Sequence, residues 1–308
     1  TLLSAHYYLS GLIGLKIKEK YKIPLIVTFH TLALMKNLVA KSEDEREGFQ
    51  RIKSEFLLTK KADKIIATSL NDLEYIHILY DCTLAKIAVL TPGVDLKLFR
   101  PIDKPKAKKI IKADLNHKLV LFVGRIEPLK GIDVLLYAIK ILIQKNPKML
   151  LCLWIVGGNN INNKKRWPKE LKRLEEMRKL LKLKAYVRFV GKKTVKELPY
   201  YYNSAEMVIL PSQYESFGMV AVEAFACGVP VIITDATGMS DLLDKEHSFM
   251  LTSAGNPIRL ARKIENLLTN KKEHQRLSKD VLKKVQELSW ENVADRFIQI
   301  LINNGFLC

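Results

Sequence analysis

Cysteine is scarce in this sequence, and the few cysteines form no recognisable pattern. The four residues are Cys82, Cys152, Cys227 and Cys308, and no two of them make a CxxC pair. Zinc sites and disulfide frameworks both need cysteines at characteristic spacings, so this scatter argues against either. Unpaired thiols fit a reducing compartment, and we predict a cytoplasmic protein.

The sequence also lacks a long apolar run. Its most hydrophobic stretch, Met149–Val156, is far shorter than the roughly 20 residues of a membrane-spanning helix, and no signal peptide is recognisable. The chain begins with Thr1 inside an apolar, strand-like segment. We therefore expect that the opening part of the first domain is missing.

Acidic residues are few compared with basic ones. The chain has 32 acidic and 51 basic residues, which gives a formal net charge of +19. Lysines spread over solvated helix faces would explain this excess, and so would attraction to polyanionic substrates or anionic lipid head groups. No RNP motif, zinc finger or helix-turn-helix pattern accompanies the charge, so we expect no nucleic-acid partner. We do expect peripheral contact with an anionic membrane at its inner face.

Several well-known catalytic signatures are missing as well. There is no GxxxxGK[ST] phosphate loop, no GxGxxG fingerprint, no GxSxG elbow, no HExxH motif and no protein-kinase signature. These absences argue against the enzyme classes that those motifs define. A DxD motif is absent too, so we expect no dedicated metal site and no bound cofactor.

What the sequence does contain is a regular alternation of short apolar runs with longer segments of helical period. Its 308 residues are enough for two domains. The alternation predicts an α/β fold with two Rossmann-like, doubly wound domains that face a cleft, the N-terminal one being incomplete. The predicted strands are Leu25–Phe29, Lys64–Thr68, Ile87–Leu90, Leu119–Val123, Leu150–Val156, Val187–Val190, Met207–Leu210 and Pro230–Thr234.

Helices are predicted between and after these strands. Their ranges are Tyr8–Lys20, Ser42–Lys61, Asn71–Ile78, Gly131–Asn146, Lys169–Leu181, Thr194–Asn203, Gly218–Ala226, Gly238–Leu243, Pro257–Leu268, Lys271–Val285 and Ser289–Ile302. A segment rich in proline and charge follows the turn Thr91–Gly93 and marks a domain boundary near Pro101. We therefore divide the chain into residues 1–101, residues 102–286 and a final segment, residues 287–308.

The loop Gly124–Gly131 is the first place where chemistry is expected, because ligands of doubly wound sheets bind outside the carboxyl ends of the strands. It follows the predicted strand Leu119–Val123 and precedes a helix. Gly124 permits a sharp exit from the strand. Arg125 and Lys130 place two cations beside a helix N-terminus, which suits a diphosphate. A surface loop with ordinary basic residues explains the same pattern about equally well.

A second loop, Pro211–Met219, follows the predicted strand Met207–Leu210. Glu215 lies just before the next helix, and Glu223 lies two turns into it. The free amides of Phe217–Met219 can bind an anion. Carboxylates on both sides of an anion site suit a sugar nucleotide. Glu215 is also explained as a carboxylate that interacts with the helix dipole. Glu223 is also explained as a residue on a solvated helix face, although its apolar neighbours weaken that explanation.

Other strand ends carry further candidates. Gly191 ends a strand and is followed by Lys192 and Lys193, which could approach a base or a phosphate. A tight turn with solvated lysines is at least as good an explanation. His6 and His30 lie at or just past strand ends in the N-terminal part. Because no third ligand has a suitable spacing, we expect them to hydrogen-bond a substrate rather than to bind a metal.

Two stretches of the chain resemble the retaining family 4 glycosyltransferases. These are Phe122–Gly131 and Pro211–Val231, and the second contains the E-x7-E signature as Glu215 and Glu223. The resemblance covers essentially the whole chain, including Leu288–Glu291. It implies the GT-B fold, with the last helix crossing back onto the N-terminal domain.

The resemblance also implies roles for individual residues. Arg125 and Lys130 would neutralise the donor diphosphate. Glu215 would bind donor-sugar hydroxyls, Glu223 would bind the ribose, and His30 would lie at the reacting centre. The expected catalytic residues are His30, Arg125, Lys130 and Glu215. The expected donor-binding residues are Gly124, Arg125, Lys130, Gly191, Glu215, Phe217, Gly218, Met219 and Glu223.

The N-terminal stretches Ala5–Gly11 and Thr28–Asn37 are similar to a subset of this family, the D-inositol-3-phosphate glycosyltransferases and bacterial sucrose-phosphate-synthase-like enzymes. In the former, positions that match Tyr7, Thr31 and Arg51 bind a phosphorylated acceptor. The expected acceptor-binding residues are therefore His6, Tyr7, Thr31 and Arg51. Arg51 also shares a helix face with Glu55, so a local ion pair explains it as well as a substrate clamp does.

These residues together predict transfer of a hexose from an NDP-sugar, with a UDP-sugar favoured, to a hydroxyl acceptor. The acceptor is expected to be a small or lipid-linked molecule that carries a phosphate, and the reaction to retain configuration without a metal ion. The N-terminal glycine-rich loop of the family is absent from this sequence. A sugar-nucleotide-binding or membrane-docking module without turnover therefore remains an alternative, as does a related epimerase or phosphorylase.

Overall fold

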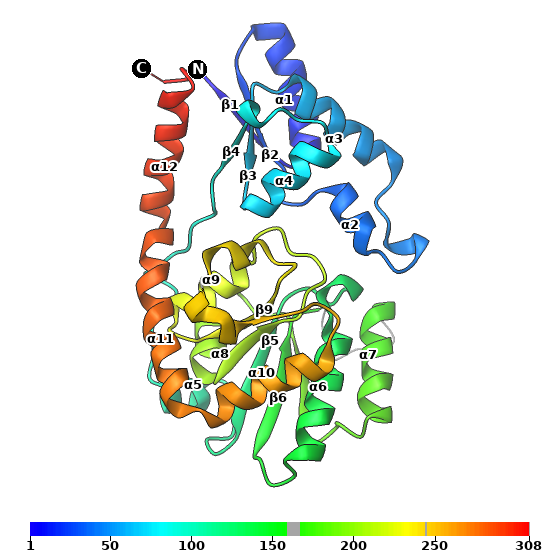
Figure 1. The fold of residues 1–308 in the computed structure, drawn as a ribbon, viewed down its shortest axis with the longest axis vertical. Helices are drawn as coiled ribbons and strands as arrows, with labels where there is room; N and C mark the ends of the chain where they lie inside the picture. The colour runs from blue at the N-terminus through cyan, green and yellow to red at the C-terminus, as the bar shows by residue number, and fades with distance from the viewer. Residues whose placement is uncertain (159–166, 244, 308) are drawn as a thin grey trace.

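The computed structural model describes residues 1–158, 167–243 and 245–307. It contains two α/β domains, one above the other in Figure 1, and each is built on a parallel sheet. The chain passes through the upper domain, then through the lower one, and returns to the upper domain in its last helix. The predicted α/β fold class is confirmed.

The N-terminal domain has four parallel strands that lie side by side in chain order. They are β1 (Leu3–His6), β2 (Leu25–Thr28), β3 (Lys64–Ala67) and β4 (Ile87–Val89). The helices around them are α1 (Tyr7–Tyr21), α2 (Ala33–Val39), α3 (Phe49–Lys61) and α4 (Leu70–Leu79). β2 and β3 are buried along their whole length, as expected of parallel strands with both faces covered.

The C-terminal domain has six parallel strands in the order β10-β9-β8-β5-β6-β7. They are β5 (Lys118–Val123), β6 (Leu151–Val156), β7 (Val187–Gly191), β8 (Met207–Leu210), β9 (Val231–Thr234) and β10 (Leu251–Thr252). The chain adds strands in one direction from β5 and in the other from β8. This reversal makes the sheet doubly wound and places a topological switch point between β5 and β8.

Seven helices of this domain belong to the described residues. They are α5 (Lys104–Ile110), α6 (Ile132–Lys145), α7 (Lys169–Leu180), α8 (Leu198–Ser204), α9 (Met219–Ala226), α10 (Pro257–Thr269) and α11 (Lys271–Val285). Short 3-10 helices occur at Pro128–Lys130 and Gly238–Leu242. Within the part of the chain that the structure describes, no helix has both the length and the hydrophobicity needed to cross a membrane.

The last helix, α12 (Trp290–Asn303), connects the two domains along one side of the molecule (Figure 1). Ser289 caps its N-terminus by accepting a hydrogen bond from the backbone N–H of Asn292 at 3.1 Å. Near its other end, Leu301 packs in one cluster with Ile26 and Ile66 of the N-terminal sheet. The helix therefore begins on the C-terminal domain and ends against the N-terminal one.

β1 is the strand-like segment expected at the start of the chain, but three elements have no counterpart in the predicted strands and helices: β10, α2 and α5. Each is between two and seven residues long, which is too short for a period of apolar residues to stand out. The predicted helix Ser42–Lys61 begins only at Phe49, because Glu43–Glu45 forms a separate 3-10 turn and Gly48 is extended. The predicted helix Thr194–Asn203 likewise begins at Leu198.

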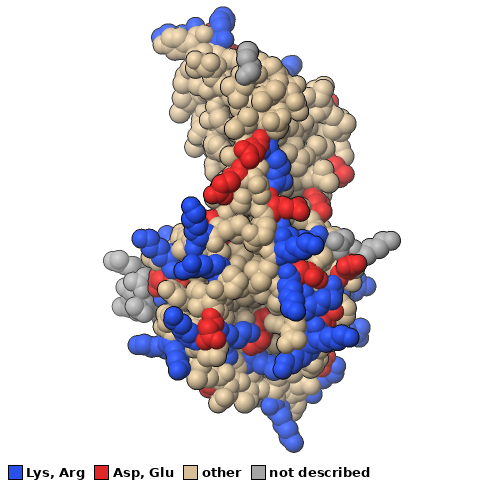
Figure 2. Space-filling view, turned by 90° about the vertical axis from the view of Figure 1, so that its left-hand side faces the viewer, with Lys and Arg blue, Asp and Glu red and all other residues tan. Residues whose placement is uncertain are grey.

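The basic residues are concentrated on the C-terminal domain. Residues 102–286 hold 35 lysines and arginines against 18 acidic residues. Figure 2 shows one face of the molecule, on which Lys and Arg side chains gather over the lower domain while much of the upper domain is uncharged. The charge excess is therefore a property of one domain.

Candidate active site

The switch point of the C-terminal sheet lies between β5 and β8, where Val120 pairs with Met207 and Leu121 with Val208. The loops that follow these two strands are consequently neighbours. The backbone N–H of Gln213 in the second loop donates to the carbonyl of Leu129 in the first at 2.8 Å. The two loops singled out in the sequence thus form one continuous surface at the carboxyl edge of the sheet.

Gly131 allows this close approach of the loops. It has a φ of +64°, and a Cβ atom at this position would lie 2.0 Å from the carbonyl oxygen of Pro211. Such a distance is well inside van der Waals contact, so only glycine fits both the backbone conformation and the space.

Lys130 and Glu215 face each other across the two loops. The ammonium group of Lys130 donates to the Glu215 carboxylate in an ion pair. Lys130 is 8% exposed, so this pair is shielded from water and interacts more strongly than a surface pair would. The pair joins the predicted diphosphate-binding cation to the first acidic residue of the signature.

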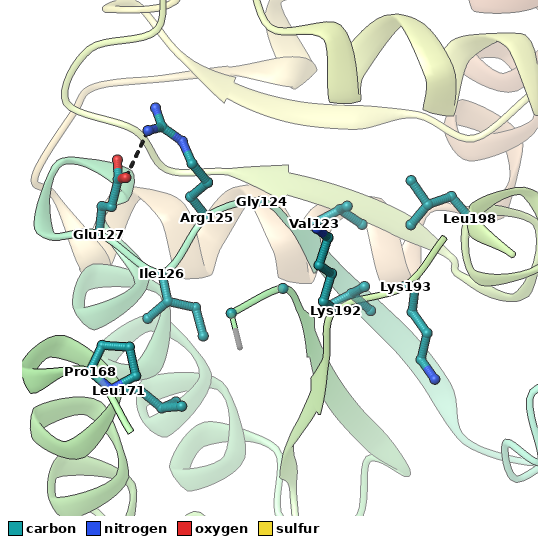
Figure 3. A pocket seen from close by; sticks show the side chains of 13 residues that line it. Val123, Gly124, Arg125, Ile126, Glu127, Pro168, Leu171, Lys192, Lys193 and Leu198 are labelled. Carbon is teal, nitrogen blue, oxygen red and sulfur yellow. Dashed lines mark ion pairs between the residues drawn. The ribbon is translucent and has the colours of Figure 1, made fainter. Parts of the chain in front are cut away.

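Arg125 lies next to this pair but points elsewhere. Its guanidinium forms an ion pair with Glu127 of the same loop at 2.8 Å, and its side chain is 62% exposed (Figure 3). An exposed arginine held by one carboxylate can turn toward an incoming anion at little cost. Arg125 is therefore available to a ligand without being fixed in place for one.

Two cavities meet at Arg125. The first has a volume of about 500 Å³ and lies over the carboxyl ends of β5, β6 and β7 (Figure 3). It is lined by Val123, Gly124, Arg125, Ile126, Glu127, Val156, Gly157, Gly158, Pro168, Leu171, Lys192, Lys193 and Leu198. This lining combines apolar walls with several cations, a composition that accepts a planar ring and an anion.

The second cavity, of about 510 Å³, lies between the two domains. It shares Val123, Gly124 and Arg125 with the first cavity. Its other lining residues are Tyr7, His30, Thr31, Thr68, Pro92, Phe122, Lys130, Leu210, Glu215, Ser216, Phe217, Gly218, Met219, Val220 and Trp290. Residues from both domains thus surround the Lys130–Glu215 pair.

Comparison with known proteins identifies the family. Residues 103–284 match the family described as glycosyl transferases group 1, and residues 1–98 match glycosyltransferase family 4. A D-inositol 3-phosphate glycosyltransferase of Rhodococcus erythropolis is 32% identical over 311 residues, which are 99% of this chain and 70% of that protein. The chain belongs to glycosyltransferase family 4.

Solved structures of related glycosyltransferases show the same fold. The sucrose-phosphate synthase of Thermosynechococcus elongatus superposes with a TM-score of 0.86 and 29% identity over 98% of this chain and 73% of that one. The Anabaena protein HepE, in complex with UDP and glucose, superposes with a TM-score of 0.83 and 20% identity. The superposition covers 98% of this chain and 78% of HepE. The predicted GT-B arrangement of two parallel-sheet domains is confirmed.

Glu223 of this glycosyltransferase is not among the residues that line either cavity. Its carboxylate accepts a hydrogen bond from the hydroxyl of Tyr202 on α8 at 2.6 Å. Burial raises the pKa of Glu223, and this hydrogen bond opposes the rise. The structure thus gives Glu223 an intramolecular partner.

Gly191 also lies just outside the linings of the two cavities. It ends β7 with a φ of +82°, and its carbonyl accepts from the backbone N–H of Gly157 at 3.0 Å. Its neighbours Lys192 and Lys193 do line the first cavity. The turn at Gly191 therefore directs the following residues, Lys192 and Lys193, to the first cavity.

Two histidines and a tyrosine from the N-terminal domain form a cluster at the second cavity. Nδ1 of His6 lies 2.7 Å from Nε2 of His30, and their rings stack with centroids 5.0 Å apart. The ring of Tyr7 also lies 5.0 Å from that of His30. Burial, followed by the charge of His6, lowers the pKa of His30. His30 therefore favours its neutral form, which can accept a proton.

Both Tyr7 and His30 have a left-handed backbone, with φ values of +65° and +60°. This conformation is unfavourable for residues other than glycine, and such strain is concentrated at functional sites. The second cavity is lined by Tyr7, His30 and Thr31. His6 is not among its lining residues and contacts His30 instead.

Arg51 is fully engaged by protein groups and is not among the residues that line the cavities. Its guanidinium pairs with Glu47 at 2.9 Å and with Glu55 at 2.8 Å. It also donates to the carbonyl and to the hydroxyl of Thr31, at 2.9 and 3.1 Å. Glu55 is completely buried. The ion pair foreseen between Arg51 and Glu55 is present, and it holds Thr31 at the edge of the second cavity.

Sequence reasoning missed several residues of the second cavity, among them Thr68, Ser216 and Trp290. Thr68 ends a predicted strand, and Ser216 lies inside the signature loop, so both positions were signalled by the strand-end rule. Trp290 carries no such signal, because only the path of α12 brings it against Gly93. A Cβ atom on Gly93 would lie 2.7 Å from its indole ring.

No group of three or more His, Cys, Asp or Glu side chains among residues 1–158, 167–243 and 245–307 is arranged to hold a metal ion.

Proposed function

We propose that this glycosyltransferase moves a hexose from a UDP-sugar to a hydroxyl acceptor. The observation that carries the proposal is the shielded Lys130–Glu215 pair at the switch point of the sheet. This pair lies in the second cavity, which continues past Arg125 into the first cavity, on the C-terminal domain. Two joined cavities with cations at their junction fit a ligand that has two phosphates between a nucleoside and a sugar.

The nucleoside belongs in the cavity over β5, β6 and β7. Ile126 and Leu198 offer apolar walls for a base there, and Lys192 offers a donor beside it. The sugar then lies in the cavity between the domains, near Glu215 and the amides of Phe217–Met219. The structures of HepE with UDP-glucose and with UDP and glucose support a UDP-sugar as the donor class.

The departing UDP carries negative charge, and fixed cations lower the free energy of that state. Lys130 is held in place by Glu215, and Arg125 is free to turn toward a phosphate. Removing a preorganised group such as Lys130 typically costs about 3–4 kcal/mol at the transition state. We propose that these cations and the helix amides act without a metal ion, so added EDTA should leave the rate unchanged.

The acceptor approaches from the N-terminal domain, where Tyr7, His30 and Thr31 face the same cavity. We propose that neutral His30 donates to His6 through Nε2 and accepts a hydrogen bond from the acceptor hydroxyl at its other ring nitrogen, because its lowered pKa leaves that nitrogen unprotonated at neutral pH. The name of the Rhodococcus relative supports a phosphorylated acceptor. A phosphate that binds Arg51 would have to displace Glu47 from it.

We also propose that the product keeps the anomeric configuration of the donor, as the resemblance to the retaining family implies. Nuclear magnetic resonance of the first product formed would distinguish the two anomers. Formation of the opposite anomer would contradict this part of the proposal.

Calorimetry with UDP and the variant Lys130→Ala tests the donor site. We expect UDP binding to weaken by about 10- to 100-fold, because a hydrogen bond to a charged group contributes roughly 1.5–3 kcal/mol. Lys145→Ala is the matched control, since this lysine pairs with Glu265 on the surface at 2.7 Å and should leave UDP binding unchanged. Equal UDP affinity of Lys130→Ala and the wild type would contradict the proposed site.

A further inference from the structure

The loop that carries Glu215 is attached to the N-terminal domain on both sides of that residue. Tyr214, directly before Glu215, is 3% exposed and belongs to the hydrophobic core of the N-terminal domain rather than to that of its own. Ser216, directly after it, faces Asp72 and Thr68 of the N-terminal domain. Glu215 itself points the other way, to Lys130.

On the Ser216 side, the attachment consists of hydrogen bonds to Asp72. The Ser216 hydroxyl donates to its Oδ2 atom, and the Thr68 hydroxyl donates to the same atom at 2.6 Å. The two hydroxyl oxygens lie 3.0 Å apart. The hydrogen bond from Thr68 holds the Asp72 carboxylate in place, and Asp72 in turn holds Ser216.

Asp72 is buried. The residue is 4% exposed, and its Oδ1 atom is buried without a hydrogen-bond partner among the described residues. Burial raises the pKa of Asp72 to about 6, although the hydrogen bonds from Ser216 and Thr68 oppose this rise. Keeping a carboxylate in such a place costs free energy, which points to a use for it other than stability.

The packing around the attachment leaves little room for Ser216 to move. A Cβ atom on Gly238 would lie 2.0 Å from the carbonyl oxygen of Ser216 and 2.6 Å from the hydroxyl of Ser69. The backbone N–H of Gly238 also donates to the carbonyl of Glu215 at 2.9 Å. Glycine at position 238 thus lets the two domains meet directly at the signature loop.

We propose that Asp72 is a positioning residue for the donor sugar: through Ser216 it sets the place of the Glu215 carboxylate. The sugar subsite is then complete only when the N-terminal domain contacts the loop, so the domain that receives the acceptor also shapes the donor site. The nucleoside cavity involves neither Asp72 nor Ser216. This inference rests on the proposed function.

The test compares the binding of UDP with that of UDP-glucose by calorimetry. For Asp72→Ala we expect UDP affinity within about twofold of wild type and UDP-glucose affinity lower by about tenfold, a coupling typical of groups in one network. Asp72→Asn should recover much of the loss, because its amide oxygen still accepts from Ser216. Ser216→Ala should match Asp72→Ala, and the double variant should be no worse than either.

The matched control is Asp241→Ala. Asp241 also joins the domains, since its carboxylate accepts from the backbone N–H of Leu70 at 2.9 Å, but among the described residues its side-chain hydrogen bonds go to the start of α4 and not to Ser216. If Asp241→Ala reproduces the selective loss, or if Asp72→Ala leaves UDP-glucose binding at the wild-type level, the positioning role is overturned.

The proposed function can fail separately from this inference. A wild type that binds neither UDP nor UDP-glucose would overturn the proposed function and the inference with it. A wild type that binds both, and loses affinity for both in Lys130→Ala, would leave the function standing even if the Asp72 variants behave like wild type.

Discussion

At the scale of single residues, Gly131 shows how closely the site constrains the chain. Its positive φ would cost a non-glycine residue about 1–2 kcal/mol, and the Pro211 carbonyl oxygen lies 2.0 Å from the position of a Cβ atom. Gly255 has a similar φ of +70° but no atom within 4 Å of the same position. Comparing substitutions at Gly131 and Gly255 therefore separates the cost of backbone strain from the cost of steric overlap.

We therefore expect Gly131→Ala to destabilise the protein by more than Gly255→Ala does. The control should cost about 1–2 kcal/mol from its backbone alone, and the extra loss at position 131 comes from the overlap with Pro211. Denaturant unfolding of both variants measures the difference. Equal losses would mean that the loops can separate without cost.

His30 makes stability depend on pH in a defined direction. Its pKa is lowered below 6.5 by burial and by His6, so the unfolded chain takes up a proton before the folded one does. The free energy of unfolding should therefore fall as pH decreases below 6.5, and this decrease should level off below the folded-state pKa.

Unfolding of wild type and His30→Asn at pH 7.5 and pH 5.0 measures this contribution. Asparagine tolerates the positive φ of this position better than other side chains do. We expect the variant to lose less stability than wild type between the two pH values. An identical pH dependence of the two proteins would show that His30 does not supply it.

At the scale of elements, the sequence predicts every strand of the C-terminal domain except β10, and most of its helices, because the longer strands are mainly apolar runs. The strand-end rule then selects the loops around Lys130 and Glu215, which the structure brings together. The rule does not give the direction of side chains. Arg125 turns to Glu127 and Glu223 to Tyr202, and neither contact follows from loop position.

The contribution of the N-terminal domain to the site is the least predictable part. Asp72 lies on α4 and Ser216 between β8 and α9, and 144 residues separate them in sequence. No local pattern reports a hydrogen bond between such distant residues. Short elements such as α2 and β10 are not predicted either, because tertiary packing determines them rather than a periodic pattern of apolar residues.

The last helix offers a test at this scale. Leu301→Ala should destabilise the protein by about 2–5 kcal/mol, because Leu301 is 6% exposed and packs against Ile26 and Ile66. Ile302→Ala is the matched control, since its side chain is 43% exposed. Denaturant unfolding that shows the same small loss in both variants would mean that α12 does not stabilise the N-terminal domain.

At the scale of the whole molecule, the two domains meet in the cavity that holds Tyr7, His30, Lys130 and Glu215. Each domain supplies one side of the proposed reaction, the acceptor from above and the donor from below in Figure 1. The excess of basic residues lies on the C-terminal domain (Figure 2). Contact of this domain with an anionic membrane stays a prediction.

The most direct test of the donor site is a crystal structure of the wild type with UDP bound. We expect the uracil in the first cavity beside Lys192 and the β-phosphate within hydrogen-bond distance of Lys130, with Arg125 turned away from Glu127 toward the phosphates. UDP bound elsewhere on the molecule, with the Lys130–Glu215 pair far from its phosphates, would contradict the proposed donor site.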